Sequence, residues 1–460
     1  MLYPRLRIAK DFLKDTGVIF ISIDDNEQQN LRKICDEIFG AQNFLGTFVV
    51  NSTPNARDYG HMGKMHEFCL MYAKNAEVTV TNMLPDMSKT FKYKDAKGGY
   101  NIHPLYNSNE AFHKENRPNL YYPFYLYKDE PVGNGFYKIG LEPRDNSVEI
   151  YPPKSLKNGV QFVWRWGKDK STRYMNEEII GYETSPNEYR IVQKMRHSEK
   201  LIRSILFDTK YSSRRGTAEV ESLLDGKIFS FPKPVSLISD FCRVGLGEND
   251  TVMDFFSGSA TTAHAVMQLN AEDGGNRKFI LVQLPEETDS KSEAYKAGYK
   301  TICDIGEERI RRAGKKIKEE TGADIDYGFR CFKVDSSNMK DVYYRPADIG
   351  QMNLDQFTDN IKEGRTPEDL LIQVMLDLGV LLSSKVEQTD IAGKKVFSVA
   401  DGYLIACFDK DVTEDVVTAI AKQKPFYAVF RDSSMANDSV AANFEQIFAT
   451  YSPQTVRKVL

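Results

Sequence analysis

Apolar positions along the first 75 residues follow the pattern of an α/β layer. Residues 2–16 carry apolar side chains at helical spacing and predict an amphipathic helix. The continuous apolar run 17–23 predicts a buried parallel strand, and residues 27–39 predict a second helix. Residues 48–50 and 66–72 are further strand candidates. The chain therefore begins with helix, strand and helix.

The pattern changes after this layer. Residues 78–215 show little periodicity and contain many turn residues and aromatics, so we expect an irregular inserted domain. In the segment Trp164-Arg165-Trp166 the two rings could stack on a ligand, but core packing is the simpler expectation for both.

The α/β pattern returns near residue 231. A strand at 251–254, a helix at 260–269 and a strand at 278–284 make one β-α-β unit, followed by a long helix at 301–318. Beyond it, alternating segments predict a small α+β domain at the C-terminal end.

Composition narrows the class of protein. The chain has 460 residues, 41% of them hydrophobic, which suffices for two or three domains with cores of their own. The net charge of −4 means that nucleic-acid binding would need a local basic face. Six cysteines without C-x-x-C spacing favour reduced thiols in a cytoplasmic protein and make a zinc site unexpected. We see no run of membrane-spanning length and no secretory signal.

The most informative stretch is Asp254-Phe-Phe-Ser-Gly-Ser-Ala-Thr-Thr-Ala-His264, where a strand ends in an acid and a small-residue turn leads into a helix. Gly258 allows close approach of a ligand, and the helix start offers free N–H donors. An ordinary strand-to-helix turn is the alternative. The phosphate-binding G-K-[ST] and the NAD-binding G-x-G-x-x-G are both absent, so a nucleotide-dependent oxidoreductase is a weaker interpretation.

These residues carry a family resemblance. Asp254-Phe-Phe-Ser-Gly-Ser resembles the D-x-F-x-G-S-G loop that binds S-adenosyl-L-methionine in amino-methylating DNA methyltransferases. Together with the runs 231–237 and 269–286, it looks like the modification subunit of type III restriction-modification systems. The resemblance implies a site-specific DNA adenine-N6 methyltransferase with a Rossmann-like sheet that is incomplete at the N-terminal side.

The resemblance also implies a domain order. We expect the first part of the methyltransferase core at 1–77, a target-recognition domain at 78–215, the cofactor-binding part of the core at 216–330, and a C-terminal interaction domain at 331–460.

The residues expected to bind S-adenosyl-L-methionine come from the loop and from the segments on either side of it. They are Phe231, Lys233, Pro234, Asp254, Phe255, Phe256, Ser257, Gly258, Ser259, Thr261, Thr262, Gln283 and Glu286. Two departures from the family pattern stand out. Ala260 replaces a glycine common in relatives, and the acid that holds the ribose hydroxyls is replaced by Gln283, with Glu286 as the other choice.

The catalytic tetrapeptide Asp-Pro-Pro-Tyr is absent from the sequence. The only Pro-Pro, Pro152-Pro153, lacks the leading acid and the trailing aromatic and reads as a turn. In the family the tetrapeptide precedes the opening helix, so we expect this chain to start downstream of it and to be inactive alone. A separate N-terminal fragment could supply it. The alternative is a non-catalytic recognition subunit that positions a restriction helicase-nuclease.

Residues expected at the base pocket or on DNA are His66, Glu67, Tyr72, Arg196, Arg203, Arg214 and Arg215. Each has a simpler alternative: a structural hydrogen bond for the first two, a strand-core tyrosine, and a solvated helix face for the arginines. His264 is expected to pack. The expected partners are double-stranded DNA, a second copy in a homodimer, and the restriction subunit.

Overall fold

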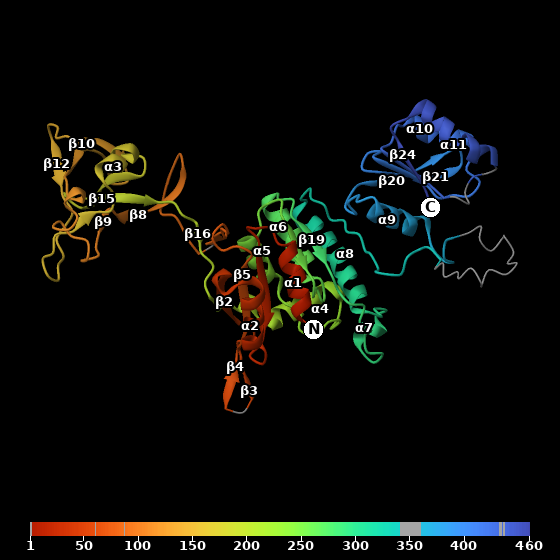
Figure 1. The fold of residues 1–460 in the computed structure, drawn as a ribbon. Coiled ribbons are helices and arrows are strands. Elements are labelled where there is room, and N and C mark those ends of the chain that lie inside the picture. The colour runs from red at the N-terminus through yellow and green to blue at the C-terminus, as the bar shows by residue number, and fades with distance from the viewer. Residues whose placement is uncertain (1, 60, 87, 341–359, 432–434, 436–437) are drawn as a thin grey trace. The chain divides into compact units, whose positions relative to one another are not determined.

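The computed structural model describes residues 2–460 except 60, 87, 341–359, 432–434 and 436–437. The chain forms two compact units, Met1–Arg330 and Cys331–Leu460, and each is described by itself (Figure 1). Helices and sheets alternate in both, so the predicted mixed α/β class is confirmed.

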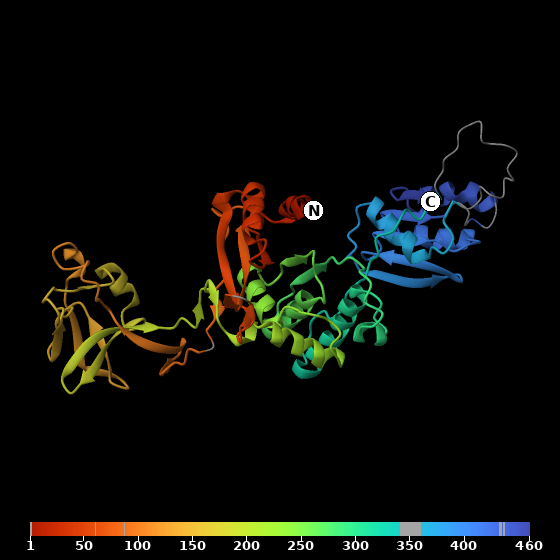
Figure 2. The ribbon, with the colours of Figure 1, turned by 90° about the horizontal axis from the view of Figure 1, so that it is seen from below.

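A four-stranded sheet opens the first unit, and its strands from the first 75 residues are red in Figure 2. In spatial order its strands are β1 (Val18–Ile23), β5 (His66–Ala73), β2 (Phe44–Asn51) and β17 (Ile205–Leu206). The prediction that residues 17–23 form a parallel strand is wrong, because β1 pairs antiparallel with β5. A continuous apolar run indicates that both faces are covered, and it does not fix the direction of the neighbour.

Helices cover both faces of this sheet. On one side, α1 (Leu2–Phe12) and α2 (Gln28–Phe39) contribute Leu6 and Leu31 to a cluster with Leu70 and Tyr72 of β5. On the other side lies α5 (Val235–Gly245), whose Phe241 stacks on Phe20 with ring centroids 4.7 Å apart. The result is a three-layer sandwich.

A second, parallel sheet consists of β18 (Thr251–Asp254) and β19 (Lys278–Leu281), joined by α6 (Thr261–Asp273). The same α5 packs on it, since Cys242 shares a cluster with Val252 and Phe279. The helices α4 (Ser213–Leu224) and α8 (Ile302–Thr321) complete this region, and a Thr301–Asp304 capping box starts α8. The predicted β-α-β unit is therefore present.

Residues 78–215 contain a regular sheet, so the expectation of irregular structure is corrected. Its seven antiparallel strands, in spatial order, are β12 (Ser147–Ile150), β10 (Phe124–Gly133), β11 (Phe136–Gly140), β14 (Ile179–Ser185), β15 (Glu188–Met195), β8 (Gly98–Pro104) and β7 (Tyr93–Asp95). Aromatic side chains fill clusters that include Phe124 and Trp164 in one and Tyr100 and Phe136 in another. Register shifts within β10 and β14 interrupt the alternation that would reveal strands in the sequence.

Several short elements accompany these sheets. They are the ribbons β3 (Arg57–Tyr59) with β4 (Met62–Lys64), β6 (Leu84–Pro85) with β16 (Glu199–Lys200), and β9 (Tyr106–Asn107) with β13 (Val163–Trp164), and the helices α3 (Lys168–Tyr174) and α7 (Glu293–Lys296).

The second unit is built on a five-stranded mixed sheet. In order it contains β20 (Val386–Ile391), β21 (Lys394–Val399), β22 (Leu404–Cys407), β23 (Tyr427–Phe430) and β24 (Val456–Val459). The first three pair antiparallel and the last three parallel. Its helices are α9 (Pro367–Asp377), α10 (Glu414–Lys422) and α11 (Asp438–Tyr451). Across the described part of the chain, no helix is both long and apolar enough to cross a membrane.

Gly216 of α4 generates a prediction about packing. A β-carbon there would lie 2.2 Å from the carbonyl oxygen of Pro232, so Gly216→Ala should destabilise the protein by about 1–3 kcal/mol. The usual benefit of alanine in a helix, about 1 kcal/mol, is then reversed. Thermal unfolding measures the change. Gly314→Ala in α8 is the control, because its nearest neighbour would lie 3.5 Å away, and it should be neutral or stabilising. Equal behaviour of the two variants would contradict the close approach.

Candidate functional site

The turn between β18 and α6 has an unusual backbone. Gly258 has a φ of 51° and Ala260 a φ of 61°, both in the left-handed region. Glycine adopts this conformation freely, whereas alanine does so at a cost of roughly 1–2 kcal/mol. Ala260 therefore keeps the backbone that a glycine would have here. No side chain caps α6 at Ala260, so its first N–H groups are available to a ligand.

The turn is held closed from both ends. The carboxylate of Asp254 accepts hydrogen bonds from the backbone N–H of Phe256 at 3.2 Å and from the hydroxyl of Thr262 at 2.6 Å. The N–H of Gly258 donates to the side-chain oxygen of Gln283 at 2.8 Å. The loop thus lies at the carboxyl ends of the two parallel strands.

This bond bears on the expected ribose contact. The side-chain oxygen of Gln283 is already engaged by Gly258, and its amide group donates to the carbonyl of Leu284. The carboxylate of Glu286 is exposed and has no hydrogen-bond or ion-pair partner among the described residues. Of the two choices left open by the sequence, Glu286 is the better acceptor for a ligand.

A buried arginine lies beneath the turn. Arg309 of α8 is fully buried, and its Nη1 donates to the hydroxyls of Ser259 at 2.7 Å and Thr261 at 2.8 Å. Its Nε and Nη2 have no partner among the described residues. Burial lowers the pKa of Arg309 to about 10, so the group stays charged at neutral pH. Charge-assisted bonds of this kind fix the turn strongly.

Arg309 is not among the residues predicted for the site, although its position in the sequence carries a signal. Ile305, Arg309 and Ala313 follow one another at four-residue spacing, so the arginine falls on the buried stripe of its helix. A charged residue on such a stripe usually has a specific partner.

The segment before α5 lies against the turn. The carbonyl of Lys233 accepts a bond from the Thr261 hydroxyl at 3.3 Å, and the Lys233 ammonium forms an ion pair with Glu67 at the start of β5. The aromatic rings of Phe231 and Phe256 are 68% and 63% exposed. Exposed aromatics beside free N–H donors can contact a flat heterocycle. The structure thus brings most of the predicted cofactor residues together, whereas Phe255 packs in the cluster under α1 and α2.

The predicted base-pocket residues separate into two groups. His66 and Glu67 are half-exposed at the start of β5, with His66 3.8 Å from Asp25. Tyr72 is completely buried, and its hydroxyl donates to Asp36 at 2.7 Å. Burial together with this bond raises the pKa of Tyr72. A side chain sealed between α2 and β5 cannot line an open pocket, so Tyr72 is the strand-core tyrosine of the alternative interpretation.

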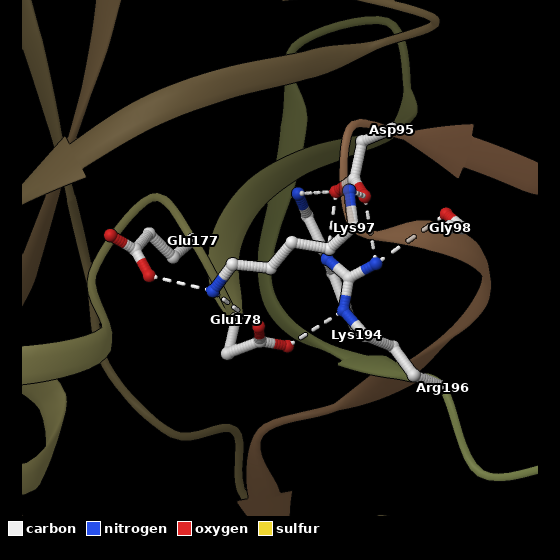
Figure 3. A network of polar contacts seen from close by, with 7 residues as sticks. All are labelled: Asp95, Lys97, Gly98, Glu177, Glu178, Lys194 and Arg196. Atoms are coloured by element: carbon white, nitrogen blue, oxygen red, sulfur yellow. Dashed lines mark hydrogen bonds and ion pairs between the residues drawn. The ribbon is translucent and has the colours of Figure 1, made fainter.

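The predicted basic stretch also divides. Arg196 binds Asp95 through both terminal nitrogens at 2.7 Å and Glu178 through Nε at 3.0 Å (Figure 3). The Arg196 guanidinium holds the pKa of the Asp95 carboxyl well below its usual range. Arg203 and Arg214 are exposed, and Arg215 pairs loosely with Glu219. The charges of Arg203 and Arg214 are therefore exposed, whereas the charge of Arg196 is engaged by two carboxylates. Among the described residues, no cluster of His, Cys, Asp and Glu could hold a metal ion.

Comparison with known proteins identifies relatives of this sequence. A family model described as DNA methylase matches residues 1–313. The type III restriction-modification enzyme EcoPI Mod subunit of Escherichia phage P1 is 31% identical over 403 residues, 85% of this chain and 61% of that protein. The EcoP15I Mod subunit of Escherichia coli is 30% identical over 450 residues, 92% of this chain and 66% of that protein.

A third relative belongs to another restriction class. The type II methyltransferase M.KpnI of Klebsiella pneumoniae is 32% identical over 313 residues, 67% of this chain and 72% of that protein. The resemblance to type III modification subunits is confirmed. The chain spans about three fifths to two thirds of the length of the two Mod subunits.

His264, in the first turn of α6, generates a pH prediction. Burial, reinforced by the nearby Arg309 and Lys316 charges, lowers the pKa of His264 from 6.5 to about 3. Below pH 6.5 the imidazole of His264 is protonated in the unfolded chain but stays neutral in the folded chain. The free energy of unfolding therefore decreases as the pH is lowered from 6.5 to about 3.

Between pH 7 and pH 5, we therefore expect the free energy of unfolding to fall by about 1–2 kcal/mol less in His264→Leu than in the parent. Thermal unfolding at the two pH values measures this difference. His103→Leu, at an exposed position, should follow the parent. Parallel pH dependence of parent and His264→Leu would show that the imidazole protonates freely in the folded state.

Proposed function

The chain belongs to the DNA methylase family, and from this premise we propose that it binds S-adenosyl-L-methionine in the turn between Asp254 and Thr262. We propose further that it acts on double-stranded DNA as part of an adenine-N6 methyltransferase. The observation that carries the proposal is the closed, glycine-containing turn at the carboxyl ends of β18 and β19. Ligands of open α/β sheets bind at such ends.

The residues around the turn suit the parts of this cofactor. The uncapped start of α6 offers N–H donors to its carboxylate, and the exposed carboxylate of Glu286 can accept bonds from ribose hydroxyls. The rings of Phe231 and Phe256 can flank the adenine. When bound, the cofactor supplies an electrophilic methyl group. Asp254 and Arg309 contribute by fixing the backbone conformation of the turn before the ligand binds.

Asp254→Ala tests this assignment. Removing the carboxylate frees Phe256 and Thr262, so the affinity for S-adenosyl-L-methionine should fall about tenfold or more. Isothermal calorimetry with the cofactor and with its demethylated product measures the change. Asp377→Asn, exposed at the end of α9, is the control and should bind like the parent. Absence of uptake of either compound by the parent chain would rule the pocket out.

We propose that methyl transfer needs a catalytic tetrapeptide from another polypeptide segment, because the 460 residues contain no Asp-Pro-Pro-Tyr. The arrangement of β1 and β18 supports this. Lys14, before β1, forms an ion pair with Asp250, before β18. Phe255, after β18, packs with the cluster that includes Ile21 and Ile23 at the end of β1. The two strands thus run in the same direction beneath α5.

The two strands are not paired with each other. Among the described residues, β1 pairs only with β5, and β18 pairs only with β19. One edge of each strand therefore lacks sheet partners, which is unfavourable for backbone N–H and C=O groups. Met253 and Ile280 leave an apolar face exposed, whereas parallel sheets are normally covered on both faces. A further parallel strand, with its own covering segment, would fit these edges.

A methyl-transfer assay with labelled cofactor and duplex DNA tests this second proposal. The chain alone should give no transfer, and addition of an N-terminal fragment bearing Asp-Pro-Pro-Tyr should restore it. Met253→Lys should weaken the restoration by placing a charge on the exposed apolar face, whereas Val80→Lys, at an exposed position outside that face, should not. The same fragment with Ala-Pro-Pro-Ala is the negative control. Transfer by the chain alone would refute the requirement.

The wider assembly follows from the relatives' names. Two relatives are Mod subunits of type III restriction-modification enzymes. We propose that this chain likewise pairs with a restriction helicase-nuclease subunit and forms a homodimer, with residues 331–460 as an interaction domain. Cytoplasmic location remains an expectation from the cysteines, of which Cys35, Cys69, Cys242 and Cys407 are buried and unbridged.

A further inference from the structure

A hollow of about 320 Å³ lies between α3 and β15 in the seven-stranded domain. It is lined by Trp166, Lys170, Tyr174, Glu178, Gln193, Lys194, Arg196 and His197. Its volume lies at the small end of the range for ligand pockets, about 300–1000 Å³. It is separate from the turn after β18, and the proposed cofactor does not account for it.

One wall of the hollow is rigid and electrically balanced. Lys194 and Arg196 both bind Asp95, and Glu178 accepts bonds from Arg196 and from Lys97 (Figure 3). Each of these carboxylates and cations already has a partner of opposite charge. The wall therefore holds the shape of the hollow without attracting an ion strongly.

The opposite wall is aromatic and carries a cation that has no such partner. The ammonium of Lys170 lies 4.3 Å from the centroid of the Trp166 ring and has no carboxylate within ion-pair distance among the described residues. Tyr174 meets Trp166 edge to face at 5.9 Å, and this contact fixes the indole plane. The hollow thus combines a held aromatic surface with an uncompensated positive charge.

The two tryptophans of the chain differ in their surroundings. Trp164 is buried, and its N–H donates to the carbonyl of Tyr122 at 2.7 Å. Trp166 is half-buried at the hollow, and its indole N–H has no acceptor among the described residues. The expectation of core packing is confirmed for Trp164, and Trp166 packs against the same core cluster while it also lines the hollow. The sequence alone could not separate them, because both flank the same arginine.

We propose that this hollow binds one unpaired nucleotide of a DNA strand, with its base stacked on Trp166 and its phosphate on Lys170. Base stacking on aromatic side chains needs no particular base, and a lysine beside the ring supplies the phosphate contact. The proposal deepens the proposed function, because it depends on the chain binding DNA. In this proposal Arg196, whose charge is neutralised by Asp95 and Glu178, is a positioning residue in the wall of the hollow.

Tryptophan fluorescence tests the proposal directly, because the chain has only two tryptophans. Duplex DNA that contains one unpaired nucleotide should quench the emission of the full chain, and Trp166→Phe should abolish the quenching because Trp164 is shielded. Trp166→Ala should weaken DNA binding roughly 5- to 150-fold, as measured by fluorescence anisotropy of labelled DNA. Phe426→Ala, at an exposed aromatic residue in the second unit, is the control and should bind DNA like the parent.

Lys170→Met provides a variant that leaves the aromatic surface in place. It should weaken binding and lower the slope of log affinity against log salt by about one. The proposed nucleotide site would be refuted if DNA bound to the parent chain without changing its tryptophan emission and if Trp166→Ala bound DNA with full affinity. Such a result would leave DNA binding by the chain intact. Equal quenching by free dAMP at the same concentration would overturn the assignment to a DNA strand. Failure of the parent to bind any duplex at low salt would instead refute the DNA part of the proposed function.

Discussion

The turn between β18 and α6 depends on a buried guanidinium that has no carboxylate within ion-pair distance among the described residues. Arg309 reaches from α8 under Ser259 and Thr261 and holds their hydroxyls, while two of its nitrogens have no partner among the described residues. Removing a charge from water is costly unless strong bonds replace the lost hydration. The cost is tolerated where it fixes a backbone that the residues would otherwise not adopt, and Ala260 in the left-handed region is such a place.

The helix α5 joins the two sheets of the first unit into one framework. Its Phe241 packs on Phe20, and the adjacent Cys242 packs on the parallel pair through Val252 and Phe279. Neighbouring residues of one helix thus contact strands from different sheets. The turn after β18 and the start of β5 are placed relative to each other by this helix, and the ion pair between Lys233 and Glu67 spans the distance between them.

Local patterns predicted local structure well. The helix and strand positions in the core follow from apolar spacing, and the turn at Gly258 follows from its small residues. The direction and the pairing of a strand depend on neighbours that are distant in the sequence. The antiparallel pairing of β1 with β5 could therefore not be predicted from the apolar run. The same limit applies to side chains. Tyr72 donates a hydrogen bond to Asp36, and Arg196 donates one to Asp95. No short sequence motif predicts these contacts, because the partners are far apart in the sequence.

The seven-stranded domain shows the limit most clearly. Its strands carry aromatics on both faces and bulges within β10, so neither period two nor a clean apolar run appears. Arg309 and Trp166 were visible in the sequence as a charge on an apolar stripe and an aromatic beside an arginine. Only the fold shows that the first is sealed beneath the turn and that the second borders a hollow.

The short ribbon formed by β6 and β16 has a consequence for how such proteins change over generations. The chain leaves the core near Leu84 and returns near Lys200, and the two strands pair with each other, supported by the ion pair between Lys200 and Asp86. A segment whose two ends are adjacent can be replaced by another of different length without moving the scaffold around it. Recombination at this stem would exchange the whole seven-stranded domain in one event while the turn after β18 stayed as it is.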